Sequence, residues 1–199
     1  QRHGRAFSRL HLDGRGPVVL LLTLKKARTM RGGYPVTGMV ERDGALRVLV
    51  SSPQETEELG FSLGQILPPG TFLFLSGELG AGKTLFTRGL SRGLDCDELA
   101  TSPSFALLHK YEGRLPLYHL DLYRLSRPEE TAVLGLEELL EEEAVVAVEW
   151  GEVARHLSPP DFLEIRFTYG ENEDEREILF LPHGKASRLL EELAEKCGF

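Results

Sequence analysis

The stretch Gly77-Glu-Leu-Gly-Ala-Gly-Lys-Thr84 decides the fold, because it has the complete pattern G-x-x-x-x-G-K-[ST] of a phosphate-binding loop. It follows the short apolar run Thr71-Phe-Leu-Phe-Leu75, and apolar residues then recur at helical spacing from Leu85 to Leu94. A strand, a glycine-rich loop and a helix form the context in which this motif binds phosphate rather than only making a turn. The pattern therefore predicts a nucleoside triphosphate site.

Each residue type in the loop has its own task in holding a nucleotide. Glycines allow backbone N–H groups to face phosphate oxygens, and the following helix directs the positive end of its dipole at them. Lys83 is expected to reach the β- and γ-phosphates, and Thr84 to offer its hydroxyl to Mg²⁺. The predicted nucleotide-binding residues are those of the loop and the start of the helix: Gly77, Glu78, Leu79, Gly80, Ala81, Gly82, Lys83, Thr84 and Leu85.

A site of this kind also needs a carboxylate at a strand end, which holds Mg²⁺ or orients the attacking water. Glu149 follows Ala144-Val-Val-Ala-Val148, an unbroken apolar run typical of a strand buried on both faces. Asp121 ends the less apolar strand Tyr118-His-Leu-Asp121. Both acids are candidates for this role, and the alternative for each is a surface carboxylate at a strand end.

Three features near these acids stay open on spacing alone. Thr101-Ser-Pro-Ser-Phe105 stands where a switch-like loop would reach the γ-phosphate, but Ser-Pro clusters also mark ordinary turns. His109 and His119 alternate within apolar strands and are interpreted as half-buried rather than catalytic residues. Trp150, the only tryptophan, either fills core space or, beside Glu149, touches a ligand or a partner.

The other hydrophobic patterns predict a single α/β domain with a P-loop NTPase-like three-layer fold and a mixed central sheet. The chain of 199 residues is long enough for one such core. We expect strands at 45–50, 71–75, 105–111, 115–121, 144–148, 162–169 and 176–181, and helices at 52–67, 84–93, 127–143 and 185–196.

The first 38 residues differ from the rest in composition. They carry a net charge of +7, so the remainder carries −15 of the total of −8. We expect residues 1–38 to be upstream sequence outside the fold, with Met30 or Met39 as the natural start and 39–199 as the domain. A signal or transit segment is the alternative, although no small-residue cleavage site follows the apolar stretch.

Composition excludes several classes of function. An acidic body disfavours broad nucleic-acid binding, because phosphate contacts need clustered Lys and Arg. No run approaches the roughly 20 apolar residues of a membrane helix. Cys96 and Cys197 lack metal-ligand spacing and fit a reducing cytoplasm. The Asn-Lys-x-Asp signature of guanine-specific GTPases is absent, so ATP is the expected nucleotide.

Several short motifs occur in a fixed order along the chain. They are Glu55-Thr56-x-x-Leu59-Gly60, the phosphate loop, Thr101-Ser-Pro-Ser-Phe105, His119-Leu-Asp-Leu-Tyr-Arg124 and Val148-Glu-Trp150. Together they resemble the TsaE (YjeE) family, the small ATPase of bacterial threonylcarbamoyladenosine synthesis on tRNA. The family usually has aspartate where Glu78 stands and threonine where Ser104 stands, and neither change removes a phosphate or metal ligand.

The resemblance implies slow hydrolysis of ATP–Mg²⁺ that resets the synthase formed by TsaB and TsaD, through which tRNA is reached indirectly. Lys83, Asp121 and Glu149 are then the catalytic residues, and Thr84 and Glu149 hold Mg²⁺. The remaining assignments are Thr56 approaching the nucleotide from the first helix, and Ser102, Ser104 and Trp150 in the nucleotide-responsive or partner-facing region.

Two alternatives from other classes stay open. A small-molecule P-loop kinase would need an arginine-bearing lid, for which Arg124 and Arg127 are the available side chains. An ATP-gated binding module would hydrolyse ATP only incidentally. Phosphorylation of a metabolite would favour the first, and support of modification without turnover would favour the second.

Overall fold

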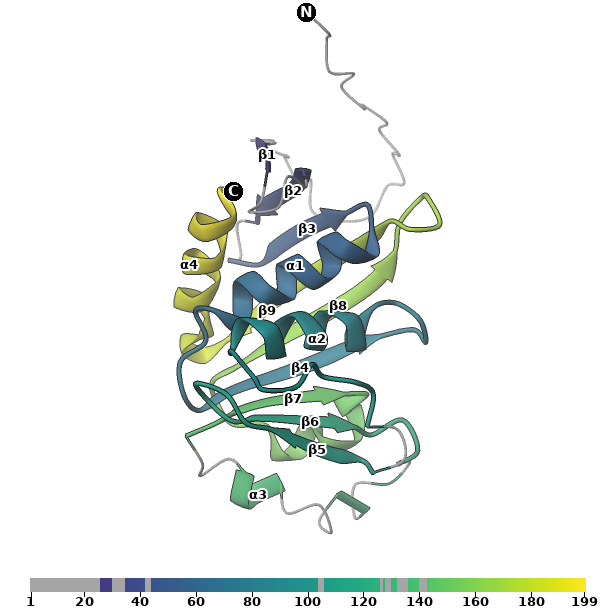
Figure 1. Cartoon of the computed structure of the whole chain (residues 1–199), viewed down its shortest axis with the longest axis vertical. Coiled ribbons are helices and arrows are strands. Elements are labelled where there is room, and N and C mark those ends of the chain that lie inside the picture. The colour runs from purple at the N-terminus through teal and green to yellow at the C-terminus, as the bar shows by residue number, and fades with distance from the viewer. Residues whose placement is uncertain are drawn as a thin grey trace, which may run out of the picture.

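A mixed β-sheet forms the middle layer of the molecule (Figure 1). The computed structural model describes residues 26–29, 35–41, 44–103, 106–125, 127, 130–131, 136–139 and 143–199. Within these residues, nine strands follow the order β1-β2-β3-β9-β8-β4-β7-β6-β5. Their bounds are Lys26–Thr29 (β1), Pro35–Val40 (β2), Leu46–Val50 (β3), Thr71–Gly77 (β4), Leu108–Tyr111 (β5), Leu117–Asp121 (β6), Val145–Glu149 (β7), Phe162–Tyr169 (β8) and Arg176–His183 (β9).

Helices cover both faces of this sheet and make the outer layers. The helix that follows the phosphate loop packs on one face together with the first and last helices, and two short helical segments pack on the other. The predicted three-layer α/β fold is therefore confirmed. The helices are Pro53–Gly64 (α1), Lys83–Gly93 (α2), Leu136–Leu139 (α3) and Ser187–Cys197 (α4), with 3₁₀ segments Gly151–Leu157 (η2) and Gly184–Ala186 (η3).

The centre of the sheet is parallel, and this arrangement creates the site. β4 pairs in parallel with β7 and with β8, and β7 pairs in parallel with β6. Asp121, the last residue of β6, is therefore the register partner of Glu149, the last residue of β7. Parallel pairing brings the carboxyl ends of β4, β6 and β7 to the same edge of the sheet.

The apolar runs that predicted central strands are buried on both faces. In β4, Leu73 and Leu75 join the core under α1 and α2, whereas Phe72 and Phe74 join the opposite core. β7 divides its residues in the same way, and all five are buried. A strand enclosed on both faces needs apolar side chains at every position, which is why these runs do not alternate.

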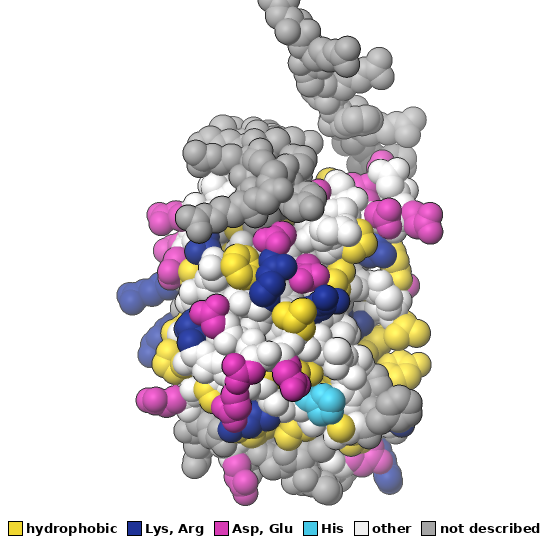
Figure 2. Space-filling model, viewed as in Figure 1, with side chains coloured by type: hydrophobic (Ala, Val, Ile, Leu, Met, Phe, Trp, Pro, Cys, Tyr) yellow, Lys and Arg dark blue, Asp and Glu magenta, His cyan; other side chains and the backbone are white. Residues whose placement is uncertain are grey.

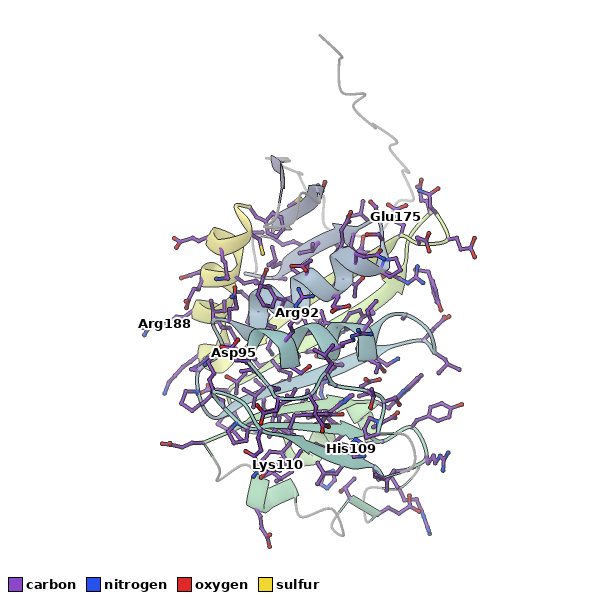
Figure 3. The ribbon with its side chains drawn as sticks, in the orientation of Figure 1. Arg92, Asp95, His109, Lys110, Glu175 and Arg188 are labelled. Carbon is purple, nitrogen blue, oxygen red and sulfur yellow. The ribbon has the colours of Figure 1, made fainter. Side chains whose placement is uncertain are left out.

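Glycines bring α1 and α2 into close contact. A Cβ on Gly89 of α2 would lie 2.0 Å from the Glu57 carbonyl oxygen of α1, and one on Gly60 would lie 2.2 Å from the Phe86 oxygen. Arg92 of α2, labelled in Figure 3, extends toward α1 and pairs with Glu57 and Glu58. Because larger side chains would separate the helices, this contact fixes α1 against the helix that begins at the phosphate loop.

The strands β1 and β2 precede the predicted start of the domain. β2 pairs antiparallel with β3 over Thr37 to Val40, so the predicted boundary between residues 38 and 39 falls inside a strand. Gly38 also lies against the C-terminal ring, because a Cβ there would be 2.4 Å from Phe199 Cγ. Residues 1–25 and 30–34, including Met30, lie outside the described residues. Independent folding of residues 39–199 stays a prediction.

Most predicted elements agree with the observed ones. The hairpin of β8 and β9, the buried strand β7 and the C-terminal helix α4 occur at the expected places. The helix predicted over 127–143 is described only as the four-residue α3, and much of that range lies outside the described residues. The strand predicted from Phe105 begins at Leu108 as β5, because Leu107 has a left-handed backbone with φ 62°.

Candidate functional site

The phosphate loop joins β4 to α2. Its glycines are needed because some adopt a left-handed backbone conformation and one has no room for a side chain. Gly80 and Gly82 have φ values of 78° and 107°, in the left-handed region that residues with a Cβ avoid. At Gly77 a Cβ would meet the Phe167 carbonyl oxygen of β8 at 2.4 Å. The loop can therefore wrap closely around a small anion at the N-terminus of α2.

Lys83 lies under the loop and is buried. Its Nζ donates hydrogen bonds to the carbonyl oxygens of Gly77 at 2.7 Å and Glu78 at 2.9 Å. The same ammonium lies 4.1 Å from the centre of the Trp150 ring, at a distance typical of a cation–π contact. These contacts hold the positive charge of Lys83 at the mouth of the loop.

Glu149, at the end of β7, receives two hydrogen bonds on one carboxylate oxygen. Thr84 Oγ1 at the start of α2 donates to Glu149 Oε1 at 2.9 Å. His119 Nε2 of β6 lies 2.9 Å from the same oxygen. Glu149 is 3% exposed and His119 is fully buried, whereas Thr84 is only half-buried, so this chain of three side chains leads from the core to the cavity.

Asp121, at the end of β6, lies beside Glu149 and connects to the loop before β5. Its Oδ2 accepts from Ser102 Oγ at 3.1 Å, and its Oδ1 accepts from the Tyr123 backbone N–H at 3.1 Å. The Ser102 contact brings the predicted nucleotide-responsive loop to the site. Ser104, predicted to act with Ser102, lies outside the described residues.

Trp150 directly follows Glu149 in a left-handed conformation, with φ 58°. This conformation is unfavourable for a bulky side chain and occurs mainly where the surroundings require it. The ring lies 5.1 Å from the ring of Tyr123, in addition to its contact with Lys83. Trp150 therefore lines the cavity on one side and also packs against the core around Phe72 and Phe74, so both alternatives that the sequence left open apply.

One cavity of about 450 Å³ collects most of the predicted residues. Four other predicted residues that the structure describes do not line it. One of them, Thr56, is buried behind the loop, with Cγ2 3.4 Å from where a Cβ of Gly82 would stand. Gly77, Glu78 and Ala81 form the loop without lining the cavity. The predicted residues that do line it are Leu79, Gly80, Gly82, Lys83, Thr84, Leu85, Ser102, Asp121, Glu149 and Trp150.

The structure adds residues that the sequence did not assign to the site. His119 contacts Glu149, and Tyr123 and Arg124 line the cavity. Tyr169 of β8 donates from its hydroxyl to the Leu79 carbonyl oxygen at 2.8 Å and so supports the outer side of the loop. The spacing of His119 and Asp121, two residues apart in a strand, is a signal that both face the same side.

The oxygen donors around the cavity suit Mg²⁺ held together with a nucleotide. The Thr84 hydroxyl and the carboxylates of Asp121 and Glu149 are hard ligands of the kind that Mg²⁺ prefers. The described residues contain no cluster of three or more His, Cys, Asp or Glu that would hold a metal alone. Mg²⁺ usually takes one or two protein ligands together with water and substrate phosphates.

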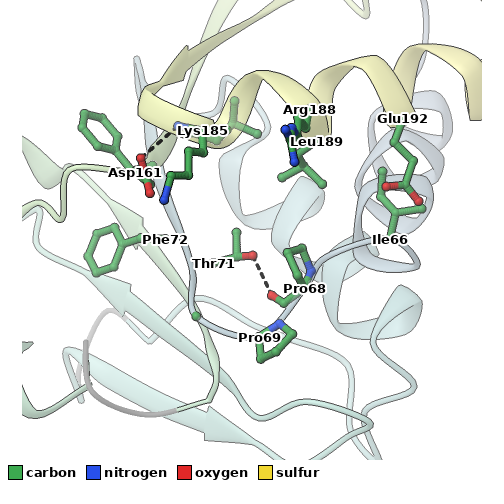
Figure 4. A pocket seen from close by; sticks show the side chains of 14 residues that line it. Ile66, Pro68, Pro69, Thr71, Phe72, Asp161, Lys185, Arg188, Leu189 and Glu192 are labelled. Atoms are coloured by element: carbon green, nitrogen blue, oxygen red, sulfur yellow. Dashed lines mark hydrogen bonds between the residues drawn. The ribbon is translucent and has the colours of Figure 1, made fainter.

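A second cavity, of about 410 Å³, opens where β4 and β8 begin (Figure 4). It is lined by apolar side chains such as Phe72 and Leu189, with Lys185 and Arg188 at its edge. Asp161 accepts the Lys185 backbone N–H at 2.9 Å, which orients the chain entering η3. No glycine-rich loop or buried charged side chain lines this cavity, which lies at the other end of β4 from the phosphate loop.

A buried carboxylate on the far side of the sheet has a structural role. Glu164 of β8 is 4% exposed, and burial alone would raise its pKa. Hydrogen bonds from Arg155 at 2.6 Å and Arg166 at 2.8 Å outweigh that effect and lower the pKa of Glu164 to about 2. Glu164 is therefore ionised and paired at neutral pH, away from the candidate site.

The face of the molecule in Figure 2 shows no basic patch among the described residues. On the face viewed in Figure 2, Lys and Arg side chains alternate with Asp and Glu rather than gathering in one area. No described helix combines the length and apolarity needed to cross a bilayer. Both cysteines are free thiols, and burial raises the pKa of each to about 11.

The strand, glycine loop and helix, with carboxylates at the ends of two adjacent parallel strands, define a P-loop NTPase-like protein. Residues 50–178 match the model of the family described as "Threonylcarbamoyl adenosine biosynthesis protein TsaE". The chain belongs to the TsaE family.

Individual relatives agree with this assignment. The chain is 40% identical over 134 residues to a Nostoc protein named "tRNA threonylcarbamoyladenosine biosynthesis protein TsaE", covering 65% of this chain and 82% of the relative. A Bacillus subtilis protein of the same name is 38% identical over 145 residues, covering 72% and 90%. The crystal structure of Bacillus subtilis YdiB superposes with a TM-score of 0.64 at 34% identity, covering 79% of this chain and 97% of that one.

Proposed function

We propose that this protein binds ATP with Mg²⁺, hydrolyses it slowly, and by this reaction serves the threonylcarbamoyladenosine modification of tRNA. The observation that carries the proposal is the convergence of Lys83, Thr84 and Glu149 on one cavity beside a loop built for phosphate. Mg²⁺, when bound, would offset the negative charge that develops on the phosphates during hydrolysis.

The side chains of the site have separate tasks in this proposal. Lys83 exchanges the carbonyl oxygens of Gly77 and Glu78 for phosphate oxygens, which are stronger acceptors for an ammonium group. Thr84 donates its hydrogen to Glu149, so its oxygen lone pairs are left for the cation. Asp121 stands beside this pair and is assigned to orienting the attacking water.

The partners in this proposal are TsaB and TsaD, and tRNA is reached through them rather than by a basic surface. Ser102 contacts Asp121, and Trp150 contacts Lys83. We assign both residues to the region that responds to the nucleotide or faces a partner. We assign the protein to the cytoplasm, where free thiols such as those of Cys96 and Cys197 persist.

The test is ATP hydrolysis by the purified chain, measured alone and together with TsaB, TsaD and substrate tRNA. We expect the partners to stimulate hydrolysis, and tRNA modification to continue beyond one turnover only when this chain and ATP are present. A Lys83→Ala variant is the control and should support neither. Unchanged hydrolysis, with modification independent of this chain, would overturn the proposed role.

A further inference from the structure

His119 lies in the core, at a position where packing alone does not account for a histidine. The five residues of β6 are all buried, and His119 itself is fully buried between β5 and β7. Its Nδ1 has no hydrogen-bond partner among the described residues. A buried ring nitrogen without a partner costs stability, so an apolar side chain would suit the strand better.

The other ring nitrogen has a defined partner. A carboxylate only accepts hydrogen bonds, so the 2.9 Å contact with Glu149 Oε1 requires the hydrogen to be on His119 Nε2. Thr84 donates to that same oxygen at 2.9 Å. Two donors from different elements, β6 and α2, therefore fix the orientation of one carboxylate.

We propose that His119 is a positioning residue that orients the Glu149 carboxylate for Mg²⁺–nucleotide binding. This inference rests on the proposed function, because it assigns a task within that site. Glu149 is held at Oε1 by His119 and Thr84, and this keeps its charge aimed at the cavity edge where the Thr84 hydroxyl lies. Residues that orient a ligand in this way typically change metal affinity about 10- to 100-fold when replaced.

A matched pair of variants separates hydrogen bonding from shape. His119→Gln places an amide N–H close to the position of Nε2, whereas His119→Met has similar length and no donor. The measurement is calorimetric binding of a non-hydrolysable ATP analogue, with Mg²⁺ and with EDTA. The ratio of the two dissociation constants gives the gain in affinity that Mg²⁺ provides.

We expect His119→Met to reduce this gain about tenfold and His119→Gln to keep most of it. Affinity in EDTA should stay similar in both variants. The melting temperature of His119→Met should stay within a few degrees of the wild-type value, because the substitution removes the orphaned Nδ1 as well as the hydrogen bond to Glu149, and these effects oppose each other. In a Glu149→Gln background, His119→Met should add less than about a twofold effect, because the two residues act together.

Three results would overturn the inference. The first is that His119→Met keeps the full gain in nucleotide affinity that Mg²⁺ provides. The second is that this gain falls equally in His119→Gln and His119→Met. The third is that His119→Met lowers the gain as much in the Glu149→Gln background as in the wild type. If His119→Met does not fold, the test rests on His119→Gln, which must still bind the nucleotide more tightly with Mg²⁺. Loss of this Mg²⁺ effect in His119→Gln would also overturn the inference. If the wild type binds no nucleotide, the proposed function itself fails, and that outcome is distinct from the other three.

Discussion

The two ends of the central parallel strands carry cavities of similar size that differ in the burial of their charged side chains. At the carboxyl ends the cavity of about 450 Å³ is bordered by the buried side chains of Lys83, Asp121 and Glu149. At the amino ends the cavity of about 410 Å³ also has charged residues in its lining, but Lys185, Arg188 and Glu192 are exposed and Asp161 is half-buried. Volume therefore does not distinguish the two, whereas buried polar side chains do.

The hydrogen bonds at the two ends differ as well. At the carboxyl ends they join separate elements, since Glu149 of β7 receives Thr84 of α2 and His119 of β6. At the amino ends Thr71 donates to the Pro68 carbonyl oxygen at 2.6 Å within a turn, and Asp161, which is only half-buried, accepts the Lys185 backbone N–H (Figure 4). The buried charged side chains at the carboxyl ends have hydrogen-bond partners, and the N-terminus of α2 adds the positive end of its dipole beside them.

The sharpest test of this contrast replaces one lysine at each end. Lys83→Ala should lower ATP hydrolysis at least about 100-fold, because it removes the charge that meets the phosphates. Lys185→Ala, at the edge of the second cavity, should stay within about twofold of the wild type. Steady-state hydrolysis at saturating Mg²⁺ measures both, and equal losses would erase the distinction between the ends.

Glu149→Gln tests the carboxylate within the active end. We expect hydrolysis to fall about 10- to 100-fold, since the amide keeps the shape but loses the charge that faces Mg²⁺. Raising the Mg²⁺ concentration should restore part of the rate. Full activity in this variant would assign the metal to Asp121 instead.

Glu164→Gln tests a buried charge that lies away from the site. Because its pKa is lowered to about 2, the ionised Glu164 stabilises the fold above pH 4.5, and this stabilisation is lost as pH falls toward 2. The variant should unfold more easily at pH 7 by about 1–2 kcal/mol, and the difference should vanish near pH 2. Urea unfolding across this range measures it, and nucleotide affinity at pH 7 should not move.

The smallest effect is expected from Arg188→Ala. Arg188 extends outward from α4 at the edge of the second cavity (Figures 3 and 4). Arg188 is exposed, so its replacement should change the free energy of unfolding by less than about 0.5 kcal/mol. Nucleotide affinity should also be unaffected. A marked loss of affinity would show that the two ends are coupled through the sheet.

The phosphate loop and its flanking elements could be predicted from sequence because their signals are local. The run from Thr71 to Leu94 combines a buried strand, glycines at positive φ and helical periodicity, and the structure has β4 and α2 there. Glu149 could be placed at the end of a central strand for the same reason. Asp121 was predicted as a second candidate carboxylate at a strand end, but the register that places it beside Glu149 is a property of the sheet.

The role of His119 could not be predicted because it depends on contacts between distant segments. Its hydrogen bond reaches a residue 30 positions away, in a strand with which β6 pairs only in the fold. An alternating histidine in an apolar strand has the same local pattern whether it packs or positions a carboxylate. Tyr169, which contacts the loop 90 positions earlier, was missed for the same reason.

The most direct test of the central claim is binding of ATP to the wild-type chain, followed by calorimetry and by Trp150 fluorescence with and without Mg²⁺. Trp150 is the only tryptophan and contacts Lys83, so it reports movement of that side chain. We predict that ATP saturates one site, binds more tightly with Mg²⁺ and changes the Trp150 fluorescence. Lys83→Ala should abolish both the binding and the fluorescence change. Absence of binding, or binding that survives Lys83→Ala but not Lys185→Ala, would contradict the assignment of the site to the carboxyl ends of the strands.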